Sequence, residues 1–161
     1  MGYISDVALH VKGSEERFIK IQREYFYKLR DSEVKLWAAN GSNTYEVQTF
    51  HETKESYVNA GQCIWNNLGF QPTDNNCMVG SLFWQDDKWL RYYSYQCEEL
   101  LKILTGNNYS WYYIHCGEND RDFSVRNNEE EVSKFHFDVL VPYILDHEYS
   151  RPRLLAPKKI L

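Results

Sequence analysis

The chain has 161 residues and a mass of 19.3 kDa, a size typical of one domain. Hydrophobic residues make up 43% of it and charged residues 25%, which excludes a disordered, collagen-like or coiled-coil protein. Aromatic residues reach 16%, although the mean hydropathy is −0.63. Because Tyr and Trp combine an apolar ring with a polar group, this excess predicts half-buried sheet surfaces or a surface that contacts a partner.

The net charge is −5, but the last twelve residues hold four basic side chains and no acidic one. The remaining 14 basic and 23 acidic residues give positions 1–149 a charge of −9. An acidic body lacks the Lys and Arg clusters that bind phosphate backbones, so we expect no direct nucleic-acid binding. We divide the chain into one domain, 1–149, and a basic tail, 150–161, which is either docked on an acidic face or frayed.

The sequence shows no secretory signal and no apolar run as long as a membrane helix, so we expect a cytoplasmic protein without a membrane partner. Its four cysteines, Cys63, Cys77, Cys97 and Cys116, stand far apart without a C-x-x-C pair. This spacing favours buried thiols over disulfides or zinc ligands. We therefore predict no metal site and no cofactor.

Hydrophobic periodicity and turn signals predict alternating strands and helices. Period two marks the first strand, and a stripe of Phe18, Ile21, Tyr25 and Leu29 marks the first helix. In chain order we expect a half-buried strand at 3–11, a helix at 14–29, a hairpin at 34–38 and 45–49, a helix at 53–68, a loop at 71–77, a strand at 78–84, a helix at 94–104, and strands at 109–116, near 123–125 and at 135–141.

Residues 39–77 are interpreted as an insertion into a simpler pattern. Without them the order is strand, helix, strand, strand, helix, strand and a C-terminal hairpin. This order is typical of the ferredoxin-like plan, an α+β fold with an antiparallel sheet and two packed helices. Right-handed crossovers place the first strand between the strands at 78–84 and 109–116, antiparallel to both.

Three blocks of the chain resemble a family of small, uncharacterised bacteriophage proteins that begin with MGYRSDV. Met1–Val7 resembles that start, Lys88–Tyr95 is similar to the family's KWY-(x)-SY segment, and Ile114–Asp120 is similar to its IRIGED strand end. The chain differs at Ile4, where the family has Arg, and at His115-Cys116, where it has Arg-Ile. The resemblance implies a role inside an infected host and supplies no activity.

The predicted topology brings these three blocks to one edge of the sheet, because the start of the first strand lies beside the ends of its two neighbours. The expected cluster consists of Tyr3, Ser5, Asp6, Lys88, Trp89, Tyr93, Glu118 and Asp120. It is interpreted either as structural, with Asp6, Glu118 and Lys88 tying strand ends together, or as a binding patch around Trp89. A third interpretation makes Asp6 and Glu118 an acid and base pair.

No set of nucleophile, base and orienting group stands out, so we name no catalytic residue and expect no enzyme. The leading hypothesis is a phage host-takeover or anti-defence inhibitor that contacts a host protein, such as a basic nucleic-acid-handling or defence protein. Alternatives are a protein that sequesters a nucleotide signal near Lys88 or Arg126, and a carboxylate-dependent hydrolase. A homo-oligomer stays open. Trp65, Trp89, Tyr92 and Tyr93 follow no clear stripe and point to the partner surface.

Overall fold

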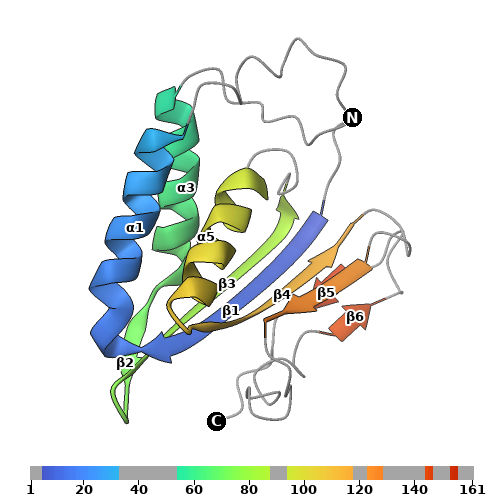
Figure 1. Cartoon of the computed structure of the whole chain (residues 1–161). Helices are drawn as coiled ribbons and strands as arrows, with labels where there is room; N and C mark the ends of the chain where they lie inside the picture. Colours follow the sequence, from blue (N-terminus) through green and yellow to red (C-terminus); the bar gives the residue numbers. More distant parts are fainter. Residues whose placement is uncertain are drawn as a thin grey trace.

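The computed structural model of the chain describes residues 5–32, 54–87, 94–117, 123–128, 144–146 and 153–155. Five antiparallel strands form one sheet in the order β2-β3-β1-β4-β5, and β6 and β7 form a two-stranded ladder. Three helices lie on one face of the five-stranded sheet (Figure 1). The elements are β1 Ser5–Ser14, the 3-10 turn η1 Glu15–Arg17, α1 Phe18–Asp31, α3 Lys54–Leu68, β2 Gln71–Thr73, β3 Cys77–Asp87, α5 Ser94–Gly106, β4 Ser110–Cys116, β5 Phe123–Asn127, β6 Ile144–Asp146 and β7 Arg153–Leu155.

The strand order confirms the predicted α+β fold of the ferredoxin-like type. The central strand β1 pairs antiparallel with β3 on one side and with β4 on the other. The first four strands follow the order β2-β3-β1-β4, with α1 and α5 in the positions of the two crossover helices. β5 extends this sheet by pairing antiparallel with β4.

The prediction of a loop at 71–77 is wrong. Gln71–Thr73 forms the edge strand β2, and β3 already begins at Cys77. Asn75 and Asn76 adopt positive φ angles of 72° and 58°, so Asp74–Asn76 forms the hairpin turn that joins β2 to β3. β3 also continues to Asp87, past the break predicted after Trp84, because Ser5 and Val7 still pair with it across a bulge.

Other predicted elements lie outside the described residues. These are the hairpin at 34–38 and 45–49 and the last strand at 135–141. The helix expected over 53–68 is present as α3, and Gly69 ends it with a φ of 58°. α3 and β2 both fall within 39–77, the segment interpreted as an insertion, and they contribute to the helix layer and the sheet.

The helix layer is held together by a close approach of α1 to α3. The stripe of Ile21, Tyr25 and Leu29 is buried, as its spacing predicts. Gly61 of α3 faces this stripe, and a Cβ at that position would lie 2.4 Å from Cδ1 of Leu29. The missing side chain lets the hydroxyl of Tyr25 donate a hydrogen bond of 3.1 Å to the carbonyl oxygen of Gly61.

Trp65 belongs to the core rather than to a partner surface, which corrects its interpretation from the sequence. Only 5% of it is exposed, and its ring lies 5.3 Å from that of Phe18, 5.8 Å from that of Phe26 and 4.8 Å from that of Phe70. Trp65 lies one helical turn after Gly61 on α3, so it shares the face of α3 that contacts α1. The simple stripe counted from the sequence was too narrow for a helix that contacts both α1 and the sheet.

β1 is buried on both faces, although its alternating pattern predicts one buried face. Val7, Leu9 and Val11 face the helices, and the opposite face carries Asp6, Ala8 and His10 with exposed fractions of 0%, 2% and 5%. A second hydrophobic cluster on that opposite face is built from Ala8, Ile114 and Cys116, with Phe83 and Tyr112 packed against it. A central strand of a covered sheet does not need alternating hydrophobicity, since neither face meets water.

Part of the basic tail is ordered as a strand. β7 pairs with β6, matching Asp146 with Arg153 and Ile144 with Leu155. β7 also approaches β1, whose two edges are already hydrogen-bonded to β3 and β4. Arg153–Leu155 therefore meets the central strand at a face or an end, and these three residues of the tail are part of the fold.

We expect Gly13→Ala to destabilise the protein by about 1–3 kcal/mol, because a Cβ there would lie 2.2 Å from the ring of Tyr109, whose hydroxyl donates to the carbonyl of Ser14. Gly106→Ala is the matched control, since a Cβ at this helical position meets nothing within 4 Å. The control should be neutral or stabilising by up to about 1 kcal/mol. Urea unfolding of both variants checks this, and equal midpoints would contradict it.

Candidate functional site

The strand ends expected to form the predicted cluster do lie side by side. Ser5 pairs with Asp87 at the end of β3, and Asp6 pairs with Cys116 at the end of β4. Ser5 and Asp6 are completely buried, so neither side chain reaches solvent at this edge. The other proposed members, Tyr3, Lys88, Trp89, Tyr93, Glu118 and Asp120, lie outside the described residues.

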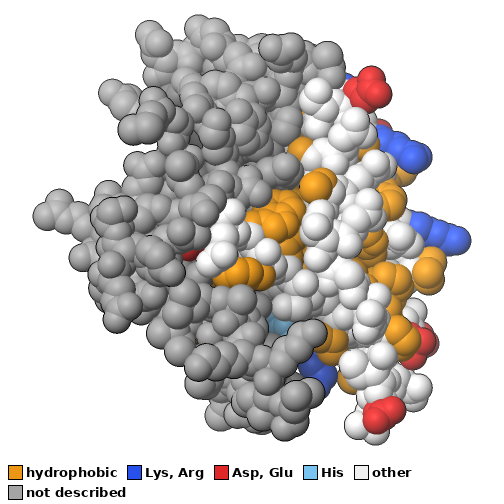
Figure 2. Space-filling model, turned by 180° about the vertical axis from the view of Figure 1, so that it is seen from behind, with side chains coloured by type: hydrophobic (Ala, Val, Ile, Leu, Met, Phe, Trp, Pro, Cys, Tyr) orange, Lys and Arg blue, Asp and Glu red, His pale blue; other side chains and the backbone are white. Residues whose placement is uncertain are grey.

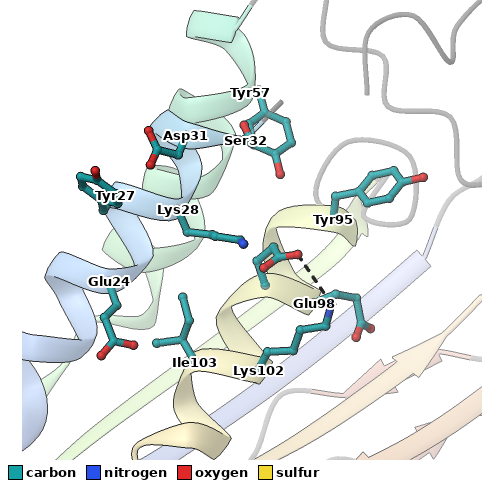
Figure 3. Close-up of a pocket in the computed structure, with 11 residues that line it drawn as sticks. Glu24, Tyr27, Lys28, Asp31, Ser32, Tyr57, Tyr95, Glu98, Lys102 and Ile103 are labelled. Atoms are coloured by element: carbon teal, nitrogen blue, oxygen red, sulfur yellow. Dashed lines mark ion pairs between the residues drawn. The ribbon is translucent and has the colours of Figure 1, made fainter. Parts of the chain in front are cut away.

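A groove lies between α1 and α5, which sequence patterns did not predict (Figure 3). It has a volume of about 1010 Å³. The wall on the α1 side ends at Ser32, and the first turns of α3 supply Tyr57. The lining residues are Glu24, Tyr27, Lys28, Asp31, Ser32, Tyr57, Tyr95, Glu98, Glu99, Lys102 and Ile103.

α3 positions both walls of the groove between the antiparallel helices α1 and α5. Gly61 draws α1 towards α3, and Lys54 of α3 donates a 2.9 Å hydrogen bond to the carbonyl of Ser32, which fixes the end of α1. On the α5 side, the amide of Gln96 donates to the carbonyl of Tyr57 at 3.3 Å. α3 thus anchors one end of each groove wall, and Tyr57 lies between them (Figure 3).

Ion pairs on the groove walls neutralise most of its charges. Glu99 lies 3.6 Å from Lys102, and Glu24 lies 3.6 Å from Lys20 outside the groove. Lys28 extends from α1 towards α5 without an ion pair among the described residues (Figure 3). The lining contains four carboxylates against two ammonium groups, and Lys20 and Arg126 beside it pair with two of these carboxylates.

Tyr57 is a buried titratable group of the groove. The pKa of its phenol is raised from 10.0 to about 12, chiefly by burial and then by the charge of Glu99, while a hydrogen bond with the side chain of Ser32 acts to lower it. The phenol is therefore neutral at physiological pH. It can act as a hydrogen-bond donor and a flat contact surface.

Arg126, which the nucleotide hypothesis places beside a phosphate, is bound by a carboxylate of the protein. Both its terminal nitrogens reach Glu98 of α5, one of them at 3.2 Å. Its guanidinium also lies 5.7 Å from the ring centre of Trp111 and 5.9 Å from that of Tyr113. A phosphate at this position would have to displace Glu98.

Within the described ranges, no group of three or more His, Cys, Asp and Glu side chains is arranged to hold a metal ion. Burial raises the pKa of the Cys97 thiol, so this cysteine stays protonated and unreactive. None of the described helices is both long enough and apolar enough to cross a membrane.

No family model, curated protein or solved structure matches the chain.

Sequence reasoning missed the groove because its members carry no joint signal. Glu24, Lys28 and Asp31 read as an ordinary solvated helix face, and Glu98 and Glu99 read the same way on α5. One available signal was a tyrosine on each of the two helices, since Tyr27 and Tyr95 stand outside their helix stripes. These two tyrosines indicate a shared groove only when α1 and α5 are known to lie side by side and antiparallel.

We expect the free energy of unfolding to fall as pH rises from 10 to about 12, because the unfolded chain loses the Tyr57 proton while the native state retains it. Tyr57→Phe should cost about 0.5–1.5 kcal/mol near pH 8, through the lost hydrogen bond, and should make the alkaline fall shallower. Urea unfolding across this pH range checks the sign. Parallel curves for the two proteins would contradict it.

Proposed function

We propose that this chain is a bacteriophage protein that inhibits a host protein by stoichiometric contact in the host cytoplasm, without catalysis. The phage assignment rests on the resemblance of Met1–Val7, Lys88–Tyr95 and Ile114–Asp120 to the MGYRSDV family. The mode of action rests on the groove between α1 and α5, which is the observation that carries the proposal.

The groove has the composition of a protein-binding surface. Three tyrosines line it, and tyrosine is enriched at interfaces because it adds a large contact area at a low entropic cost. Tyr27 is 68% exposed at the rim, while Tyr57 is 2% exposed at the base. A partner side chain entering the groove would therefore meet rings at both levels.

The acidic body of the chain and the displaceable ion pairs of the groove favour a basic partner. Four carboxylates face two ammonium groups there, and residues 1–149 carry −9. Glu99 is paired with Lys102, whose side chain is 72% exposed to solvent. Because an exposed ion pair contributes little stability, a Lys or Arg of the partner can replace Lys102 at little cost in free energy. Long-range attraction would also speed the encounter with a basic nucleic-acid-handling or defence protein.

Pull-down from host lysate tests the proposal with a pair of charge reversals. Glu99→Lys reverses a groove charge, whereas Asp74→Lys makes the same change in the exposed turn between β2 and β3. We expect a defined host protein to be recovered with the unaltered chain and with Asp74→Lys, and at least tenfold less with Glu99→Lys. Equal recovery with both variants, or recovery of no host protein, would refute it.

The size of the groove favours one alternative, the sequestration of a small nucleotide signal. Its volume of about 1010 Å³ matches the upper end of small-ligand pockets, about 300–1,000 Å³. Tyr95 could stack on a base, and Lys28 could meet a phosphate.

A thermal-shift screen against nucleotides and cyclic dinucleotides separates the two functions. A ligand present at 100 times its Kd adds about 2.7 kcal/mol to the stability, which raises the melting temperature by several degrees. The proposed inhibitor should show no such shift with any compound. A shift that Lys28→Ala abolishes would replace protein contact with sequestration.

A further inference from the structure

The two flanks of α1 differ in chemistry, and the flank turned towards α3 forms a second surface. We name it the α1–α3 seam and define it by Phe18, Ile19, Phe26, Val58 and Phe70; the rings of Phe18, Phe26 and Phe70 pack around Trp65. Ile19 is 52% exposed, and the other four are half-buried. In the view from behind, hydrophobic side chains lie beside Lys and Arg at the edge that carries α1 (Figure 2).

The charged side chains along the middle of this seam are two arginines. Arg23 and Arg30 are exposed on the same flank of α1 as Ile19 and Phe26, and neither has an ion pair among the described residues. The facing helix has no charged residue from Ser56 to Leu68. Acidic side chains occur at the two ends, where Glu15 and Glu16 precede α1 and Glu55 stands in the first turn of α3.

We propose that the α1–α3 seam binds a protein segment that carries acidic and apolar side chains on one face. Apolar side chains of the segment would cover Ile19 and the edges of Phe26 and Phe70, and its carboxylates would pair with Arg23 and Arg30. Arg and aromatic residues are the types that dominate binding energy at protein interfaces. This surface is separate from the groove, so the inference does not depend on the proposed function.

The number and placement of the charges favour a protein over other occupants. Recognition of anionic membranes uses clusters of about four to eight basic residues, and nucleic-acid binding also needs many phosphate contacts. The middle of the seam offers two arginines and an uncharged helix. Its rings are also packed against one another between two helices, which suits a segment lying in the seam better than insertion into lipid.

Two synthetic peptides test the inference on the full chain. Both form amphipathic helices with Leu and Phe on the binding face, and that same face also carries Glu in one peptide and Lys in the other. We expect the Glu peptide to bind and to shift backbone NMR signals of α1 and α3 around Ile19 and Phe26. The double reversal Arg23→Glu with Arg30→Glu should weaken its binding at least tenfold.

The matched control is Lys28→Glu on α1 with Lys102→Glu on α5, which changes the net charge by the same amount in the groove. This control should change the affinity for the Glu peptide by less than threefold. A second pair tests the apolar contact: Ile19→Ser should weaken binding, whereas Val125→Ser, at a residue of β5 that is 43% exposed, should not. Equal losses from both double reversals, signals that shift in the groove, or equal binding of the Lys peptide would overturn the inference. So would binding to anionic vesicles or a dimer that buries the seam.

Discussion

The close contact between α1 and α3 at Gly61 is the constraint on which the helix layer depends. A Cβ at Gly61 would overlap Leu29, and the phenol of Tyr25 donates to the carbonyl of the same glycine. α1 is therefore held against α3, and α5 packs against both helices and β4. The groove towards α5 and the seam towards α3 are two consequences of this placement, because each is a flank of the same helix.

The placement of α1 also separates charges that the sequence mixes. Glu24, Lys28 and Asp31 line the groove towards α5, while Arg23 and Arg30 share the flank of Ile19 and Phe26, although the five charges lie within nine residues. Residues three or four apart share a helix face, and residues one or two apart do not. An acidic chain can therefore present an arginine-bearing surface, and net charge alone does not determine the charge of a partner.

The elements that the sequence predicted well are those whose burial follows one period. The α1 stripe of Ile21, Tyr25 and Leu29 and the central place of β1 follow from spacing and crossover handedness. β2 was missed because Gln71–Thr73 is short, exposed and contains Pro72, features that also describe a loop. Its strand character comes from pairing with β3. The groove was missed because it depends on contacts between distant helices, as shown by Tyr57 and Tyr95.

A polar chain can bury tyrosine rings when their hydroxyl groups find hydrogen-bond acceptors inside the protein. Tyr25 and Tyr109 fill the interior with rings, and each directs its hydroxyl to a backbone carbonyl, of Gly61 and of Ser14. A buried hydroxyl without a partner would cost about 1–3 kcal/mol, so each ring needs a carbonyl that no regular hydrogen bond fully occupies. Gly61 and the end of β1 supply such carbonyls. These buried tyrosines therefore depend on the nearby glycines. A Cβ at Gly13 would overlap the ring of Tyr109, and a Cβ at Gly61 would overlap Leu29, which packs beside Tyr25 in the same helix stripe.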